Sequence, residues 1–335
     1  MTSTIVIAEA GVNHNGRMDL ARKLVDVASS AGANFIKFQA FKTECIITTN
    51  LDKAKYQKKS GKSSESQYEM LKKLELSQDE LTELFIYCSK KKIGFMASAF
   101  DEESLRFISN MDVEYLKIPS GEITNIPYLR LFGRKNKKVI LSTGMSDINE
   151  IEIAVNVLLK SGLAKKNLTI LHCNTEYPTD FSDVNLNAMK TLESKFQTKV
   201  GYSDHTKGSH VAIAAVALGA SIIEKHITLN KKYKGPDHSA SLDPKELIEF
   251  VMRIRTTEKI LGSHAKIPTK SEIRNINHIR KVIVASKNIS KGEKFNLKNV
   301  TVKRAGQGLS PLYWDKVIGS KAKKNYRADE TIFIS

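Results

Sequence analysis

The chain has 335 residues, of which 41% are hydrophobic and 27% charged, so wholesale disorder is excluded and a sizeable core is available. Lys and Arg number 53 against 36 Asp and Glu, which gives a formal net charge of +17. Three scattered cysteines exclude a disulfide framework, and neither a secretory signal nor a membrane-spanning run is present, so we expect a cytoplasmic protein.

Short β-branched runs alternate with segments of helical periodicity along residues 1–262. The runs are continuously apolar, which is typical of parallel strands covered on both faces. Strands are expected at 4–9, 34–39, 93–98, 114–119, 138–143, 168–174, 199–203 and 221–226. Helix starts are marked by Ser77 with Glu80, a capping-box pattern, and by Asp243 followed by Pro244.

Eight strand–helix units in about 260 residues predict a (β/α)8 TIM barrel. A doubly wound sheet is the alternative, but it usually carries a Gly-rich turn after its first strand. The turn here reads AGVNHNG over residues 10–16, which is not G-x-G-x-x-G. The barrel is therefore favoured.

Two further segments complete the predicted organisation. Residues 41–76 form an unusually long connection, which we expect to be a partly structured lid with a short helix around 66–74. Residues 263–281 are polar, basic and weakly patterned, as in a linker. Residues 282–335 show short strands and frequent turns, so the sequence predicts a small β-rich domain with strands near 282–285, 300–303 and 331–334.

Positive charge is concentrated in residues 263–335, which hold 16 Lys and Arg against 5 Asp and Glu. A basic segment of this kind can attract nucleic acid or an anionic small substrate, or it can be a solvated face. It contains no run of five basic residues and little aromatic interleaving, so nucleic acid is not favoured.

Catalytic groups of a TIM barrel lie at the C-terminal ends of the strands and in the loops that follow. Polar residues recur there: Glu9, Lys37, Gln39, Ser98, Lys117, Ser120, Glu122, Ser142, Tyr177, Ser203, His205, Glu224 and His226. A buried ammonium needs a partner. Lys37 and Lys117 therefore indicate a bound phosphate or carboxylate or, alternatively, structural ion pairs with Glu9 and Glu122.

His205 and His226 end adjacent strands, so their imidazoles can converge on a divalent metal that keeps positions open for water and substrate. Hydrogen-bonded structural histidines are the alternative. Tyr177 is equally well explained as a packed loop aromatic, and we expect Cys173 to be a core residue. No G-x-S-x-G elbow is present, so hydrolase triad chemistry is not supported.

The sequence around these positions resembles the sialic acid synthase family over essentially the whole chain. The matching blocks occur in the family's order, at 7–16, 36–39, 116–122, 142–145, 201–206, 224–226 and 235–238. Residues 286–335 resemble the antifreeze-like SAF domain that this family carries. Ala99 and Thr175 depart from residues common in the family, and both bear on the identity of the sugar.

The resemblance implies an enzyme that condenses phosphoenolpyruvate with the open-chain aldehyde of N-acetylmannosamine. The products are N-acetylneuraminate and phosphate, formed by C–O cleavage. A legionaminate or pseudaminate synthase, acting on a 2,4-diacetamido-2,4,6-trideoxyhexose, is the alternative within the family. A Schiff-base aldolase-type barrel and a binding protein with an antifreeze-like tail are the alternatives outside it.

The resemblance also implies a divalent metal, typically manganese, with Mg²⁺ or Co²⁺ possible, and a domain-swapped homodimer. The metal ligands it assigns are His205 and His226. The donor-binding positions are Lys37, Ser98, Lys117, Ser142 and Ser203, to which Ser120 is added from its place after the fourth strand. The acceptor positions are Gln39, Glu122, Tyr177 and Asp237, together with Arg304 from the partner's tail. The candidate catalytic groups are Glu9, Lys117, Glu122 and Glu224.

Overall fold

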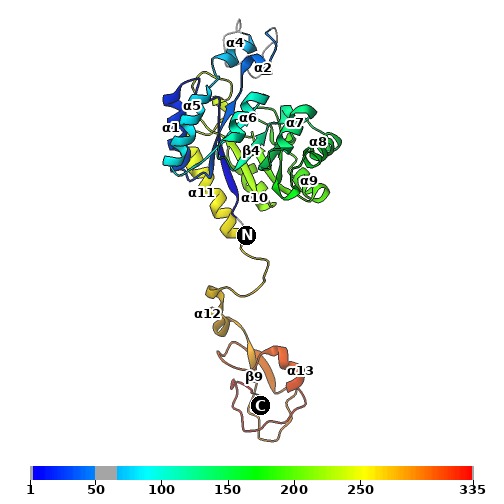
Figure 1. Ribbon diagram of the computed structural model, residues 1–335. Coiled ribbons are helices and arrows are strands. Elements are labelled where there is room, and N and C mark those ends of the chain that lie inside the picture. Colours follow the sequence, from blue (N-terminus) through cyan, green and yellow to red (C-terminus); the bar gives the residue numbers. More distant parts are fainter. Residues whose placement is uncertain (1–2, 50–65, 334–335) are drawn as a thin grey trace. The chain divides into compact units, whose positions relative to one another are not determined.

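The computed structural model describes residues 3–49 and 66–333, and its internal contacts divide the chain into two units, Met1–Gly262 and Ser263–Ser335. The first unit is a closed barrel of eight parallel strands paired in chain order, as the sequence predicted (Figure 1). Each expected strand is present, with ends that differ by at most two residues. The strands are β1 Ile5–Gly11, β2 Phe35–Ala40, β3 Gly94–Ala99, β4 Tyr115–Ile118, β5 Lys138–Ser142, β6 Leu168–Cys173, β7 Lys199–Asp204 and β8 Ile222–His226.

Helices follow the strands and cover the outside of the barrel (Figure 1). The main ones are α1 Met18–Ser30, α5 Gln78–Lys90, α6 Glu102–Asn110, α7 Ile126–Gly133, α8 Ile148–Lys160, α9 Asn187–Phe196, α10 His210–Ala217 and α11 Pro244–Leu261. Both predicted helix starts are confirmed. Ser77 and Glu80 form a capping box on α5, and Asp243 caps α11 with Pro244 in its first turn.

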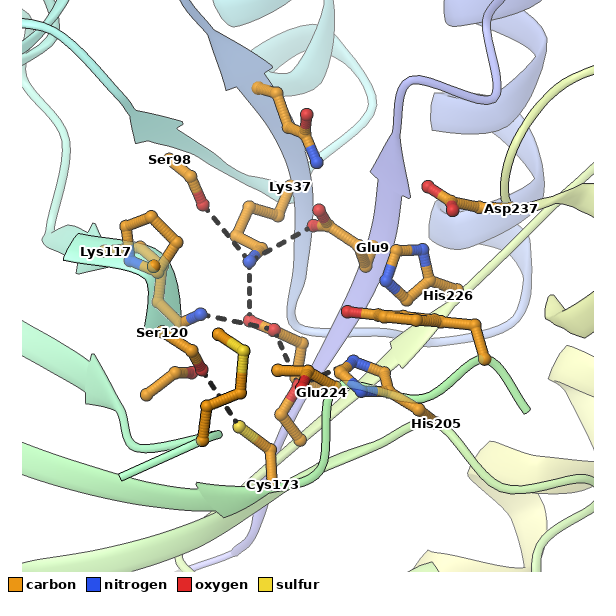
Figure 2. A pocket seen from close by; sticks show the side chains of 18 of the residues that line it. Glu9, Lys37, Ser98, Lys117, Ser120, Cys173, His205, Glu224, His226 and Asp237 are labelled. Carbon is orange, nitrogen blue, oxygen red and sulfur yellow. Dashed lines mark hydrogen bonds and ion pairs between the residues drawn. The ribbon is translucent and has the colours of Figure 1, made fainter. Parts of the chain in front are cut away.

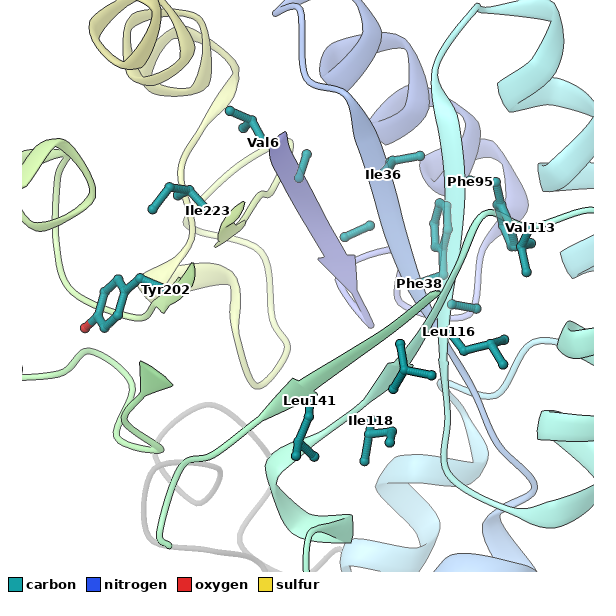
Figure 3. Packing of buried hydrophobic residues seen from close by; sticks show 14 of the residues in the cluster. Val6, Ile36, Phe38, Phe95, Val113, Leu116, Ile118, Leu141, Tyr202 and Ile223 are labelled. Atoms are coloured by element: carbon teal, nitrogen blue, oxygen red, sulfur yellow. The ribbon is translucent and has the colours of Figure 1, made fainter. Parts of the chain in front are cut away.

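Strand alternation sorts the barrel's apolar residues into two layers. Outward-facing side chains such as Val6, Ile36 and Phe38 belong to the large buried cluster between strands and helices (Figure 3). A smaller inward-facing cluster consists of Ile7, Met96, Tyr115, Ile140, Leu171 and Ile222. Inward residues nearer the C-terminal ends are polar, so the barrel has an apolar floor and a polar mouth.

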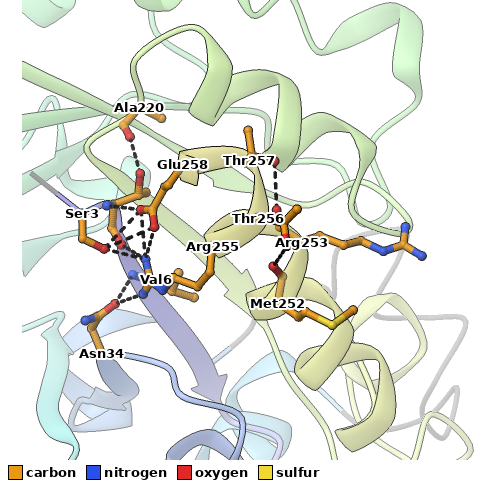
Figure 4. Close-up of polar contacts among 11 residues, drawn as sticks. Ser3, Val6, Asn34, Ala220, Met252, Arg253, Arg255, Thr256, Thr257 and Glu258 are labelled. Atoms are coloured by element: carbon orange, nitrogen blue, oxygen red, sulfur yellow. Dashed lines mark hydrogen bonds and ion pairs between the residues drawn. The ribbon is translucent and has the colours of Figure 1, made fainter. Parts of the chain in front are cut away.

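At the N-terminal end of the barrel, polar contacts join α11 to the residues just before β1 and β2 (Figure 4). Arg255 donates from Nη1 to the Thr4 carbonyl at 2.7 Å and from Nη2 to Asn34 Oδ1 at 2.8 Å. Glu258 accepts from the Thr4 backbone N–H at 2.5 Å. These contacts tie the last barrel helix to β1 and β2.

The long connection after β2 contains the short helices α2 Thr43–Ile46 and α4 Gln67–Lys72. The second of these confirms the helix expected around 66–74, and Ser66 with Glu69 forms its capping box. The rest of the expected lid, residues 50–65, lies outside the described residues.

The second unit carries a small antiparallel sheet of β9 Val282–Ala285 and β10 Val300–Lys303, as expected, and the short helix α13 Trp314–Val317. Its core holds Ile283, Ile289, Phe295, Val317 and Tyr326. The strand expected at 331–334 reduces to one bridge, Val284 to Thr331, within the described residues.

The segment expected as a weakly patterned linker contains a regular helix, α12 Lys270–Ile279. A capping box of Thr269 and Glu272 starts this helix, and that local pattern is the signal that indicates it. In the part of the chain that the structure describes, no helix is both long and apolar enough to cross a lipid bilayer.

Candidate active site

A cavity of about 560 Å³ opens at the C-terminal ends of the strands, and residues from all eight strands line it (Figure 2). The lining residues that the sequence had singled out are Glu9, Lys37, Gln39, Ser98, Lys117, Ser120, Ser142, Tyr177, Ser203, His205, Glu224, His226 and Asp237. Polar groups that are far apart in the chain therefore meet at one place.

Local geometry explains how these side chains reach the cavity. Residues two apart on a strand share a face, so Glu224 and His226 point inward together, as do Lys37 and Gln39. At the mouth of β1, the pairing with β2 shifts register between Glu9 and Gly11, and Gly11 adopts φ +52°. That left-handed conformation favours glycine and turns the chain away from the strand directly after Glu9.

Two lysines and two glutamates form a buried charge cluster on the cavity floor (Figure 2). The Lys37 Nζ atom lies 2.9 Å from Glu224 Oε2 and 3.4 Å from Glu9 Oε2. Lys117 Nζ lies 3.3 Å from Glu224 Oε1. The ion pair expected with Glu9 is therefore confirmed for Lys37, whereas Glu224, and not Glu122, is the carboxylate that both lysines share.

Two hydroxyls belong to the same network. Lys37 Nζ donates to Ser98 Oγ at 3.2 Å, and Ser203 Oγ donates to Glu224 Oε1 at 2.9 Å. Ser142 Oγ is buried without a hydrogen-bond partner among the described residues. A buried polar group of that kind is usually satisfied by a ligand or water, so Ser142 is available to a bound molecule.

The environment separates the proton affinities of the two glutamates. Burial raises the pKa of Glu9 to about 8, an effect that Lys37 opposes only in part. Burial also acts to raise the pKa of Glu224, but Lys117 and Lys37 outweigh it and hold that pKa below its usual range. With Glu9 protonated, Lys37 and Lys117 face one carboxylate, and burial lowers the pKa of Lys117, an effect that a bound anion would oppose.

The predicted metal ligands lie side by side. The ring centroids of His205 and His226 are 5.4 Å apart, and Tyr177 stacks on His205 at 4.2 Å. His205 Nδ1 bonds the Asn174 carbonyl at 2.5 Å, which orients its Nε2 atom. His226 Nδ1 is buried without a hydrogen-bond partner within the described residues.

Both histidines are suited to metal binding because burial lowers their pKa values, to about 4 for His205, and so keeps the imidazoles neutral. Among residues 3–49 and 66–333, no group of three or more His, Cys, Asp and Glu side chains forms a complete metal cage. An ion held by this pair would complete its shell with water and substrate, as open catalytic sites do. The residues therefore fit a catalytic metal.

One predicted site residue of the first unit, Glu122, is absent from the described lining of this cavity. Glu122, in the single turn Ser120–Glu122, accepts a hydrogen bond from Asn125 at 2.7 Å and does not contribute to the described lining. Its neighbour Ser120 does. Arg304 is exposed and belongs to the second unit.

Sequence reasoning missed several lining residues. Cys173 was expected to be a plain core residue; it is buried, but it lines the cavity and lies 3.3 Å from Ser120 Oγ. Inward alternation from Leu171 on β6 is the signal that could have found it. Phe100, Met145 and Glu176 also line the cavity, as does Thr175, which the sequence had already linked to the identity of the sugar. They lie in loops, where no periodic pattern indicates direction.

A parallel barrel with lysines, carboxylates and a histidine pair at its C-terminal mouth defines a TIM-barrel enzyme. The NeuB family matches residues 24–266, and the SAF domain matches residues 280–335. The chain belongs to the NeuB family and, like the named synthases of that family, is a phosphoenolpyruvate-dependent transferase. The resemblance recognised in the sequence is thereby confirmed.

Relatives match along nearly the whole chain. It is 49% identical to an N,N'-diacetyllegionaminic acid synthase of Campylobacter jejuni, over 99% of both chains. It is 42% identical to a protein of the same name from Legionella pneumophila, over 98% of this chain and 92% of that one. A crystal structure of an N-acetylneuraminic acid synthetase from Leptospira borgpetersenii, in complex with citrate, is 38% identical with a TM-score of 0.72, covering 82% of this chain and 90% of that one.

Proposed function

We propose that this enzyme condenses phosphoenolpyruvate with a 2,4-diacetamido-2,4,6-trideoxymannose to give N,N'-diacetyllegionaminate and phosphate. The observation that carries the choice of sugar is the 49% identity, over 99% of both chains, to a synthase named for that product. The sequence had placed N-acetylmannosamine first and this sugar second. N-acetylmannosamine becomes the second candidate, supported by the 38% identity to the N-acetylneuraminic acid synthetase.

The floor of the cavity suits the donor. Phosphoenolpyruvate carries a phosphate and a carboxylate, and Lys37 and Lys117 supply two buried ammonium groups for them. The hydroxyls of Ser98, Ser120, Ser142 and Ser203 surround the same space and can donate hydrogen bonds. Charge-assisted contacts of this kind neutralise the donor and hold it in one orientation.

The opposite part of the lining suits the acceptor. Gln39, Tyr177 and Asp237 offer an amide, a phenol and a carboxylate, which can bind sugar hydroxyls and acylamino groups. His205 and His226 would hold a divalent metal, for which Mn²⁺ is our first choice. A metal bound there supplies Lewis-acid polarisation of a carbonyl oxygen.

In the proposed reaction, C3 of phosphoenolpyruvate bonds to the aldehyde carbon of the open-chain sugar. The aldehyde oxygen takes up a proton and becomes a hydroxyl. Water adds at C2 and loses one proton; the new C2 hydroxyl then loses a second proton as the C2=O bond forms and the bond from C2 to the bridging oxygen breaks, so that phosphate leaves with that oxygen and takes up a proton. Glu9 suits the proton transfers because its raised pKa lets it carry a proton near neutral pH. Glu224 suits a fixed charge, since it is ion-paired with both lysines.

We extend the proposal to the oligomer: Arg304 of one subunit reaches the acceptor in the barrel of a second copy. Mixing two inactive variants tests this directly. Arg304→Ala subunits keep an intact barrel, and Lys117→Met subunits keep an intact tail. A mixture that regains activity supports donation between subunits, whereas no recovery in a mixed dimer demonstrated by mass contradicts it.

The deciding experiment measures phosphate release from phosphoenolpyruvate with Mn²⁺, offering the diacetamido sugar and N-acetylmannosamine in parallel. We expect a clearly higher kcat/KM for the first sugar. A preference for N-acetylmannosamine would replace the proposed product by N-acetylneuraminate. No release with either sugar, from folded and metal-loaded protein, would contradict both candidates.

A further inference from the structure

The loop after β8 carries a carboxylate, that of Asp237, which lines the cavity with few contacts to hold it. Asp237 lines the cavity and is only 8% exposed, yet its carboxylate makes no hydrogen bond or ion pair within the described residues. Burial alone raises its pKa to about 6. Because no described side chain or backbone group holds the carboxylate directly, its position depends on how the backbone of this loop is fixed.

The next residue, His238, is fully buried, and both of its ring nitrogens are engaged. Its Nε2 lies 3.1 Å from Asn15 Oδ1, and its Nδ1 lies 2.6 Å from Thr228 Oγ1. The Asn15 oxygen can only accept, so Nε2 donates and Nδ1 accepts. Burial lowers the pKa of His238 to about 4, which agrees with this neutral form. The imidazole thus bridges the loop after β8 to the loop after β1.

Two asparagines of the loop after β1 make further contacts around Asp237. Asn13 Nδ2 donates to the Ile227 carbonyl at 2.8 Å and to Ser241 Oγ at 2.9 Å. Asn15 Nδ2 donates to the Lys234 carbonyl at 3.0 Å. The hydroxyl of Ser241 in turn donates to the backbone carbonyl of Asp237 at 2.7 Å.

The two loops also approach each other closely. At Gly235, a Cβ atom would lie 2.9 Å from Asn15 Oδ1 and 2.6 Å from His238 Cδ2. Gly235 adopts φ +157°, and Asn15 adopts φ +53°, a left-handed conformation that asparagine tolerates. The close approach of the two loops therefore depends on glycine at position 235, where a larger side chain would clash with Asn15 and His238.

We propose that His238, together with Asn13 and Asn15, clamps the loop after β8 onto the loop after β1 and so positions Asp237 in the acceptor half of the cavity. His238 is a positioning residue, since it acts through Asp237. The donor-binding lysines lie on β2 and β4 and are held by the barrel itself. The inference rests on the proposed function only in assigning Asp237 to the sugar.

Three substitutions of His238 test the clamp, and for each the KM for the sugar is compared with the KM for phosphoenolpyruvate. His238→Ala removes both contacts, His238→Asn keeps a polar atom toward Thr228, and His238→Gln keeps one toward Asn15. We expect His238→Ala to raise the KM for the sugar about tenfold or more, as small misplacements of binding groups do, while the KM for phosphoenolpyruvate stays within about twofold. The Asn or Gln variant should recover part of the loss.

Double substitution tests the route through Asp237. If His238 acts by placing that carboxylate, His238→Ala should cost little more once Asp237→Asn has been introduced, because coupled residues are non-additive. The matched control is His172→Ala, which removes an imidazole that contacts the Val184 carbonyl at 2.7 Å in a different loop. This control should leave the ratio of the two Michaelis constants unchanged.

Equal increases of both constants in His238→Ala, or full additivity with Asp237→Asn, would overturn the proposal. Should His238→Ala fail to fold, Thr228→Val provides a milder loss of the same support. Amide hydrogen exchange over residues 228–241 gives a readout that needs no substrate. Faster exchange there in His238→Ala and Asn15→Ala, but not in His172→Ala, is expected even if the wild-type enzyme uses neither sugar, and unchanged exchange would overturn the clamp.

Discussion

The barrel buries lysines on its outer face and on its inner face, and the two sites differ in whether the lysines can still bind an added anion. On the outer face of β7 and β8, Lys225 Nζ lies 2.9 Å from Asp204 Oδ2 and also donates to the Thr206 carbonyl. Asp204 Oδ1 accepts two further hydrogen bonds from Thr206. In this closed pair one cation meets one anion, and both side chains are at most 1% exposed.

On the inner face, Lys37 and Lys117 share Glu224, and burial raises the pKa of Glu9, so that this second carboxyl is a weaker counter-charge than Glu224. This cluster borders the cavity, and Ser142 beside it has an unused hydroxyl. The comparison teaches that burial alone does not mark a functional charge. Buried charges that border a cavity and share a counter-ion mark a binding site, whereas a balanced pair between two neighbouring strands stabilises the fold.

The largest expected effect comes from removing a cation of the inner cluster. Lys117→Met should reduce phosphate release about 10³-fold, since a preorganised charge at the reacting group is lost. The same substitution leaves one cation, Lys37, against one anion, Glu224, because Glu9 keeps its proton, so the midpoint of urea unfolding should change little. Phosphate release that stays at the wild-type level in folded Lys117→Met would show that the inner cluster, too, is only structural.

The outer pair should respond in the opposite way. Lys225→Met leaves Asp204 buried without a cation and should cost about 3–5 kcal/mol of unfolding free energy. The variant Lys225→Met with Asp204→Asn should regain most of that stability. In protein that remains folded, the KM for phosphoenolpyruvate should not change. A lost donor affinity in folded Lys225→Met would contradict the distinction between the two lysine systems.

A buried neutral histidine sharpens the comparison through pH. His14 is fully buried, and burial lowers its pKa to about 4 from an ordinary value near 6.5. Between pH 6.5 and pH 4, His14 is therefore protonated in the unfolded chain and neutral in the native state. The free energy of unfolding should fall as the pH drops from about 6.5 to about 4. The loss from this residue is at most about 3 kcal/mol. Urea unfolding at several pH values should show a shallower decline for His14→Gln, and an equal decline would contradict the assignment.

The smallest effect is expected at an exposed ion pair on α6. Arg106 Nη2 lies 3.0 Å from Glu102 Oε1, with both side chains more than 60% exposed. Water screens such a pair, so Glu102→Gln should leave the urea midpoint and the activity unchanged. A measurable loss of stability would show that surface charge contributes more here than solvent screening allows.

Much of the fold and of the site could be predicted because side chains alternate between the two faces of a strand, and this two-residue period is visible in the sequence. All eight strands, the barrel and most lining residues followed from that pattern, and Lys37 with Gln39 shows how spacing alone places two side chains on one face. The role of Glu122 stays a prediction, because this residue follows a strand end in a single helical turn, where the direction of a side chain depends on local hydrogen bonds that periodicity does not show.

The sequence by itself determined the barrel, the strand ends that bear chemistry and the family, because each of these depends on local periodicity and on short motifs. Only the tertiary structure decided which carboxylate the two lysines share, since Glu224 lies 107 residues beyond Lys117 and meets it only when the barrel closes. The tertiary structure also showed that Lys225, unlike its neighbours Glu224 and His226, is paired with Asp204 and does not line the cavity. It also joined His238 to Asn15 across 223 positions of the chain. Contacts between distant segments have no local pattern, and they are fixed only by packing.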